Sequence, residues 1–408
     1  MRPSLAMPVL MRSAIKTASS SASLDIRASV GTSTSPTSTG TKAVTGVGFQ
    51  PKVVLPFHVV ADSSAAATES VLGLGCGVSS SSRASIAVSS RNAVTTSATH
   101  RRHTAAKALT YVYNAGVDLE ADFSAFGSDG FTLDWSLVFG SAKILNHICL
   151  GGADLEVSLV QCQMNGTNAA QSFAHGLSGA PTGVLFLGAT NNTAPANTSG
   201  FLLASIGAWA TNQFSAAIWS TNGATTTNTS RRLATTGVYA YVDNSGVQRA
   251  MAVSSVDATN VNVTYPTTTS AYQSYFWMLC IRGAKCQVGT FDAYGGDTIT
   301  CSGIIPKLFL PVLVPTGVTL AGTVNSILNL SIGASDGTNN VSCGITDNNG
   351  VTTTNARRFQ SSNSLVQYDA TGTKHFEATA AFSGESVVLT RSTNNQYYGE
   401  MGYLILGS

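Results

Sequence analysis

Three marker segments recur three times along this chain, and their near-constant spacing restricts the fold more than any other feature. The markers are a proline that precedes an apolar run, an Arg-Arg pair, and an apolar segment that ends in glycine. Proline and first arginine are 50, 50 and 51 residues apart, in the pairs Pro51 and Arg101, Pro181 and Arg231, Pro306 and Arg357. From these arginines to Gly151, Gly283 and Gly407 the separations are 50, 52 and 50 residues. Repeats of this kind indicate three copies of one domain in tandem.

The length of the chain supports the same division. A single core stops growing near roughly 250–300 residues, and this chain has 408. Three units of about 125 residues match the commonest domain size. We therefore expect units at residues 24–153, 154–285 and 286–408, preceded by an extended N-terminal arm at residues 1–23.

Each unit shows about eight short apolar or alternating runs and no convincing amphipathic helix. Gly, Asn and β-branched residues, which suit strands and turns better than helices, are abundant throughout. The pattern predicts an all-β protein of three tandem jelly-roll-like β-sandwich domains. The last run of each unit is apolar almost throughout, as in Tyr275–Ile281, so we expect it in the middle of a sheet, buried on both faces.

Charge is scarce in this chain. Only 10% of residues are charged and the net charge is +2, so no global field attracts nucleic acid or an anionic membrane. No apolar run approaches the roughly 20 residues that span a bilayer. The seven cysteines are an odd number without a repeated spacing, which indicates free thiols and synthesis in a reducing cytosol. A surface so poor in charge is expected to be covered largely by partners.

The arginine pairs are the best candidate functional residues. They hold six of the 22 basic residues: Arg101, Arg102, Arg231, Arg232, Arg357 and Arg358. Each pair follows a loop rich in Thr, Ser and Asn, and adjacent residues of a strand point to opposite faces. One interpretation is an ion pair or a carbonyl clamp within the unit. The other is a contact between subunits, where bidentate arginines are favoured.

No other residue pattern indicates catalysis, a cofactor or a metal. The six histidines form no His-Glu-x-x-His pair, and Cys-x-x-Cys does not occur, so the usual zinc signals are absent. Asp118, Glu120 and Asp122 alternate along one predicted strand and could hold calcium or serve a glycosidase. The other units lack this set, which favours a solvated or interface-facing strand. We expect no enzymatic activity.

Two segments resemble known proteins. The run Thr45–Leu55, with Gly-Phe-Gln-Pro-Lys at its centre, and the run Asp129–Trp135, which leads to His147–Gly152, are similar to modules of virion structural proteins of tailed bacteriophages. The resemblance extends over nearly the whole chain after the arm, although the second unit lacks the Phe of the first motif. It implies a virion protein of β-sandwich fold, made in the host cytoplasm, with no cofactor and no catalytic residues to carry over.

Three functions are compatible with these observations. The first is a non-enzymatic structural component of the tail or adhesion apparatus. It would contact other virion proteins, such as tail, connector or capsid subunits, and form a homo-oligomer in the particle. We expect its arm to become ordered only against another chain. The second is a capsid decoration or head-spike protein. The third is a host-recognition protein that binds a surface glycan through Trp209 or Trp219, provided that both are exposed beside paired carboxylates.

Overall fold

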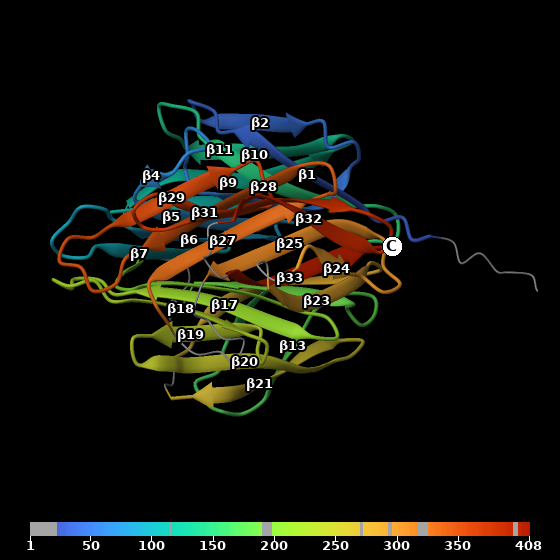
Figure 1. The fold of residues 1–408 in the computed structure, drawn as a ribbon. Helices are drawn as coiled ribbons and strands as arrows, with labels where there is room; N and C mark the ends of the chain where they lie inside the picture. Colours follow the sequence, from blue (N-terminus) through green and yellow to red (C-terminus); the bar gives the residue numbers. More distant parts are fainter. Residues whose placement is uncertain are drawn as a thin grey trace, which may run out of the picture.

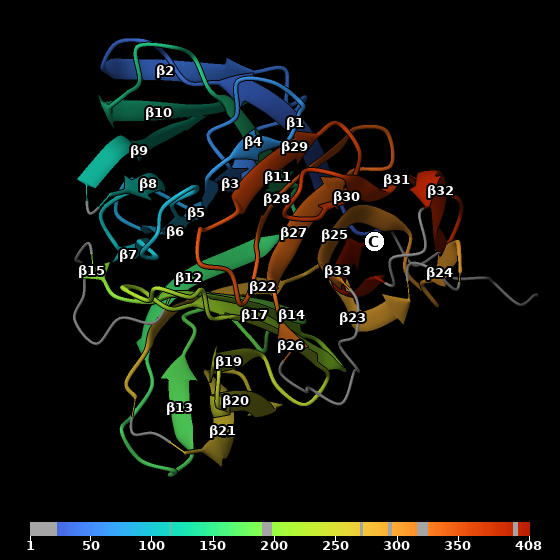
Figure 2. The same ribbon diagram turned by 60° about the vertical axis from the view of Figure 1, so that its left-hand side comes forward.

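The computed structural model describes residues 23–114, 116–189, 198–269, 272–292, 296–315, 325–394 and 399–408. Apart from residue 23, the predicted arm lies outside the described residues. Within these ranges every regular element is a β-strand, which confirms the all-β prediction. The strands form three lobes around a common centre (Figure 1, Figure 2).

The first lobe comprises β1 (Arg27–Thr34), β2 (Gly40–Thr45), β3 (Pro51–His58), β4 (Ala67–Thr68), β5 (Ser70–Gly77), β6 (Arg83–Ser90), β7 (Thr99–Thr104), β8 (Leu109–Tyr113), β9 (Gly116–Gly127), β10 (Gly130–Leu137) and β11 (Ile144–Gly151). The second comprises β12 (Glu156–Gln163), β13 (Gln171–Ala174), β14 (Gly183–Gly188), β15 (Thr198–Ser199), β16 (Leu202–Trp209), β17 (Gln213–Ser220), β18 (Thr229–Ala234), β19 (Tyr239–Asp243), β20 (Gly246–Val256), β21 (Asn260–Thr268) and β22 (Tyr275–Arg282). The third comprises β23 (Lys285–Asp292), β24 (Thr298–Thr300), β25 (Pro306–Pro315), β26 (Asn325–Ser326), β27 (Leu328–Ser335), β28 (Asn340–Asp347), β29 (Ala356–Ser361), β30 (Leu365–Tyr368), β31 (Lys374–Phe382), β32 (Ser386–Asn394) and β33 (Gly399–Gly407).

Each unit is a sandwich of a seven-stranded and a four-stranded sheet, with the same strand order in all three. In the first unit the orders are β1-β11-β3-β5-β6-β7-β15 and β2-β10-β9-β8. The first two strands wrap around the last two, since β1 pairs with β11 and β2 with β10, which is the jelly-roll-like part of the fold. The remaining strands follow one another as meanders. The third unit begins with β23 at Lys285, one residue before the expected boundary.

The units exchange short strands in a closed cycle. The outermost strand of the first unit's large sheet is β15, which belongs to the second unit and pairs with β7. In the same way β26 of the third unit pairs with β18 of the second, and β4 of the first pairs with β29 of the third. Each large sheet is therefore completed by its neighbour, an arrangement that the repeat alone did not indicate. Pairing also covers an edge that would otherwise be open to another chain.

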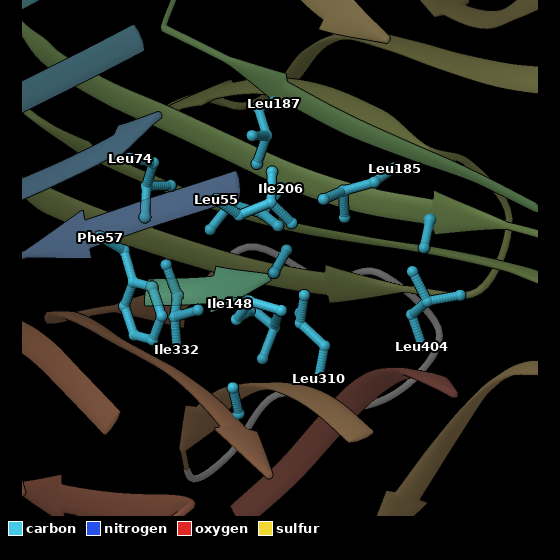
Figure 3. Packing of buried hydrophobic residues seen from close by; sticks show 14 of the residues in the cluster. Leu55, Phe57, Leu74, Ile148, Leu185, Leu187, Ile206, Leu310, Ile332 and Leu404 are labelled. Atoms are coloured by element: carbon cyan, nitrogen blue, oxygen red, sulfur yellow. The ribbon is translucent and has the colours of Figure 1, made fainter. Parts of the chain in front are cut away.

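The largest hydrophobic cluster is shared by all three units. It collects side chains from the inner faces of the three large sheets, among them Leu55, Leu74, Ile148, Leu185, Ile206, Leu310, Ile332 and Leu404. Figure 3 shows these side chains converging from strands of different units. A separate cluster fills each sandwich. Each large sheet is thus covered on both faces, which confirms the prediction that the closing strands β11, β22 and β33 lie mid-sheet and are buried.

A glycine repeated in all three units permits the two sheets to approach each other. A Cβ atom on Gly75 would lie 1.7 Å from the carbonyl oxygen of Ala108, just before β8. The corresponding distances are 2.0 Å from Gly207 to Val238 and 1.7 Å from Gly333 to Ser364. Because the obstacle is backbone, no side-chain rotation can relieve it. The Gly-rich run around Gly75 is therefore a packing feature inside a strand.

We expect Gly75→Ala to lower the free energy of unfolding by about 2 kcal/mol or more, since overpacking typically costs about 1–3 kcal/mol. Gly333→Ala should act in the same direction. Gly140→Ala is the matched control, because no atom lies within 4 Å of the added methyl group. Urea denaturation measures all three variants, and equal stability of Gly75→Ala and Gly140→Ala would contradict the close approach.

Candidate functional site: the seams between the units

The arginine pairs lie beside the exchanged strands. They occupy β7, β18 and β29, the last strands that each unit contributes to its own large sheet. In backbone register Arg101 faces Thr198, Arg231 faces Asn325 and Arg357 faces Thr68. The candidates are thus gathered at three seams between units of one chain.

The first arginine of the first two pairs contacts the next unit. The Arg101 Nη1 atom donates to the carbonyl oxygen of Phe201 at 3.1 Å, and its guanidinium carbon lies 3.8 Å from the centre of the Phe201 ring. The Arg231 Nη1 atom donates to the carbonyl oxygens of Ser326 and Ile327 at 3.0 and 2.7 Å. Both arginines are largely buried. Each therefore clamps the backbone at the end of an exchanged strand or just after it.

In the third pair the clamp is the second arginine. The Arg358 Nη1 atom donates to the carbonyl oxygen of Thr68 at 2.7 Å, whereas the Arg357 Nε atom donates within its own unit to Ala370 at 3.1 Å. Strand register explains the difference, since Arg101, Arg231 and Arg358 face Val88, Ile218 and Ile345 at equivalent positions of the preceding strand. The alignment of Arg357 with Arg101 and Arg231 was therefore wrong by one residue. The third proline-to-arginine interval, 51 residues where the first two are 50, already contained this shift of one residue.

The position after each clamp points into its own sandwich. Arg102 forms an ion pair with Glu120, with Nη2 and Oε1 2.5 Å apart. The Arg232 Nη1 atom donates to the Ser215 hydroxyl at 3.3 Å, and burial lowers the pKa of this arginine to about 10. The third unit has the buried Phe359 here, packed on Tyr368. One face of the strand thus carries the contact with the neighbouring unit, and the opposite face carries the contact within the unit.

The alternating carboxylates of β9 form no joint site. Glu120 pairs with Arg102, and Asp122 pairs with Arg83 through both carboxylate oxygens, while Asp118 is exposed. Among the described residues, no group of three or more His, Cys, Asp or Glu side chains is placed to hold a metal ion. Glu120 and Asp122 thus act as partners of arginines in the fold.

Three equivalent loops form a ring of hydrogen bonds at one end of the molecule. They connect the sixth and seventh strands of the units and span residues 91–98, 221–228 and 348–355. Each carries an asparagine whose side-chain oxygen accepts a backbone N–H from a neighbouring unit. The bonds are Thr99 to Asn222 at 2.8 Å, Thr229 to Asn349 at 2.8 Å, and Ala356 to Asn92 at 2.9 Å.

Buried hydroxyls repeat the same cycle five residues later. The side-chain oxygens of Ser97, Thr227 and Thr354 accept the backbone N–H groups of Ala224, Val351 and Val94, each at 3.0 Å. Reciprocal backbone bonds, such as Gly223 to Ser97 at 2.7 Å and Ser97 to Ala224 at 2.9 Å, join the same loops. Sequence reasoning noted polar loops but missed this ring. The recurring spacing Asn-x-x-Thr-Thr-Ser/Thr was the available signal.

At a second set of equivalent positions the three seams differ chemically. His103 of the first unit stacks on Trp277 of the second, with ring centres 4.3 Å apart and planes 9° from parallel. Between the third and first units, Gln360 and Asn146 exchange two side-chain hydrogen bonds of 2.7 and 3.0 Å. Between the second and third units, the equivalent residues are Leu233 and Gly402, and a Cβ on Gly402 would lie 2.2 Å from the ring of Phe214 on the adjacent strand β17. Burial lowers the pKa of His103 to about 3, so the stacked imidazole is neutral.

A buried acid lies at the seam between the third and first units. The Asp347 carboxylate accepts a hydrogen bond of 2.8 Å from the Ser90 hydroxyl, and its side chain is almost fully buried. Desolvation raises the pKa of Asp347 to about 7. The folded chain therefore binds this proton more tightly than the unfolded chain does.

No protein-family model matches the sequence. No curated protein matches it significantly either. Within the described residues no helix is long and apolar enough to cross a membrane. All seven cysteines carry free thiols, and all except Cys286 are buried.

We expect Arg231→Ala to lower the free energy of unfolding by about 1–3 kcal/mol, because the carbonyl oxygens of Ser326 and Ile327 lose a charged donor in a partly buried contact. The control is Arg27→Ala, whose ion pair with Asp25 is exposed and should change stability by less than about 0.5 kcal/mol. Chemical denaturation compares the two variants. If both lose the same small amount, the clamp does not hold the seam.

Asp347 should make the protein less stable as pH rises. Because the pKa of Asp347 is raised in the folded state, the contribution of its proton to stability is fully present below about pH 4, the range in which an unfolded Asp is also protonated. This contribution is lost as the pH rises through about 7. The free energy of unfolding should therefore fall across this interval more steeply in the native chain than in Asp347→Asn. Asp118→Asn, which removes an exposed acid, should keep the native slope. Denaturation midpoints between pH 4 and 8 provide the test, and parallel slopes for native protein and Asp347→Asn would refute it.

Proposed function

We propose that this chain is a non-enzymatic structural component of a bacteriophage particle, belonging to its tail or adhesion apparatus and acting through contacts with other virion subunits. The observation that carries the proposal is the closed ring of three sandwiches. Exchanged strands, arginine clamps and a common core join the units into one body with little internal freedom. Such a body suits a part that must keep its shape under load.

The chemistry of the described residues supports the same role. The conspicuous charged groups are used in clamps and ion pairs inside the fold, as with Arg102 and Glu120. The acids of β9 are separated into different pairs and do not form the couple that a glycosidase needs. A position on the capsid, as a decoration or head-spike protein, is the second candidate, and the same ring would serve it.

The arm gives the proposal a specific test. Because residues 1–23 are too few to bury a core of their own, we propose that they bind a neighbouring virion subunit. Deleting them should leave the thermal unfolding midpoint of the isolated chain within about 2 °C and should reduce its incorporation into particles at least fivefold. Quantitative mass spectrometry of purified particles measures incorporation.

Fractionation of the same particles separates the candidates. Recovery of the chain with purified tails supports the proposal, whereas recovery with tail-free heads supports the capsid alternative. Absence of the chain from purified particles would overturn both. Normal incorporation of the shortened chain would overturn the role of the arm alone.

A further inference from the structure

A polar groove of about 820 Å³ runs along the seam between the second and third units. One wall comes from the turn between β16 and β17 and from β20, and the other from the edge strand β23 and from β33. The lining residues are Trp209, Thr211, Asn212, Gln213, Thr235, Val253, Ser254, Gln287, Val288, Gly289, Thr290 and Tyr403. A concave site of this volume lies within the usual size range of ligand-binding sites, although its lining is more polar than that of most of them.

The lining offers hydrogen-bonding groups without charge. Every side chain in it is neutral, and three are amides. Two of the amides are held in place by the fold. The Gln287 Nε2 atom donates to the Tyr403 hydroxyl at 3.1 Å and to the carbonyl oxygen of Thr300 at 3.0 Å, and the Gln213 Oε1 atom accepts from the backbone of Val253 at 3.0 Å. A charged ligand would find no counter-ion here, whereas a hydroxylated ligand would find several partners.

An aromatic side chain stands beside these groups. Trp209 ends β16, packs on the sandwich interior of the second unit and is only partly buried. An indole gives a broad apolar surface, against which the C–H face of a sugar ring can pack. Trp219, the other tryptophan considered for this role, is 6% exposed and belongs to the core, and no carboxylate lines the groove, so the condition of two exposed tryptophans beside paired carboxylates is not met.

The polar and aromatic residues of the groove are not repeated at the equivalent positions of the other units. In strand register the positions equivalent to Trp209 are Gly77 and Ser335, and those equivalent to Gln287 are Ser29 and Ser158. At the seam between the third and first units, Asp336 accepts a hydrogen bond of 2.9 Å from the backbone of Val30. At the seam between the second and third units the equivalent residue is Val288, which lines the groove. The contact of Asp336 with Val30 therefore occupies, at the other seam, the place that corresponds to this wall. The second seam thus combines an aromatic side chain and amides that the fold itself does not demand.

We propose that this groove binds a neutral oligosaccharide, with Trp209 under a sugar ring and with Asn212 and Gln287 bound to its hydroxyl groups. The inference goes beyond the proposed structural role, and it gives the particle a site for an uncharged host-surface glycan. Because the isolated chain suffices to test binding, a negative result here leaves the test by particle fractionation unaffected.

The experiment is a binding titration of the full chain, followed by tryptophan fluorescence and calorimetry. The probes are neutral oligomers of two to six glucose, galactose, mannose or N-acetylglucosamine residues, together with sialyllactose and oligogalacturonate as acidic comparisons. We expect at least one neutral oligomer to bind and to quench or shift the fluorescence, and the acidic probes to bind at least tenfold more weakly. Binding of none of the neutral oligomers at millimolar concentration would overturn the proposal, as would a preference for the acidic probes.

Variants locate the site. Asn212→Ala, which changes an exposed side chain, and Gln287→Ala should each weaken binding at least fivefold, and Trp209→Ala should abolish it. Trp209→Phe retains an apolar ring in the sandwich, so it serves as the second variant if Trp209→Ala loses part of its fold. It should still bind the oligomer detectably. The matched control is Ser158→Ala, at the position equivalent to Gln287 in β12, and it should bind as the native chain does. Unchanged binding by both Asn212→Ala and Gln287→Ala would place the ligand elsewhere and refute the assignment.

Discussion

The structure depends on the fact that each large sheet must bury two faces. One face is covered by the unit's own four-stranded sheet, and the other has no cover except the large sheets of the two other units. An isolated unit would expose an apolar surface built from residues such as Leu55, Leu74 and Ile148, and the hydrophobic effect would drive it to associate. The threefold arrangement is therefore the condition under which each sandwich is complete. The exchanged strands and the loop ring then fix the rotation and height of the units relative to one another.

Three units with the same strand order in one chain face a problem of specificity, because any of them could pair with any other, within or between chains. The three seams oppose wrong pairing because their contacting side chains differ in chemistry and cannot replace one another. An amide pair such as Asn146 and Gln360 would leave buried polar atoms unbonded against the Phe214 ring, and unpaired buried groups cost about 1–3 kcal/mol each. A homotrimer cannot differ from seam to seam, since each substitution appears three times. Fusion into one chain removes that restriction, and the divergence of the seams uses it.

Much of the fold could be predicted because it is encoded locally. The repeat spacing and the apolar closing strands both depend on a pattern that one unit alone carries. The exchanged strands escaped because each is two residues long and is set by a neighbour. The shift in the third arginine pair escaped for a related reason, because both Arg357 and Arg358 satisfy the sequence pattern and only strand pairing separates them. Trp277 was expected in the core, but its partner His103 comes from another unit, which no local pattern shows.

Some surfaces of the units join them to one another, and this restricts where a ligand or partner can bind. The inner faces of the large sheets hold the units together, and the clamps use the scarce arginines for carbonyl oxygens inside the molecule. The groove between the second and third units, by contrast, is lined by hydroxyl, amide and apolar groups and carries no charged side chain. Recognition by such surfaces relies on shape and neutral hydrogen bonds more than on long-range attraction, so it depends little on salt. Because the seam arginines bind carbonyl oxygens of the chain itself, the groove between the second and third units is left with neutral hydrogen-bonding groups, which match an uncharged ligand better than a charged one.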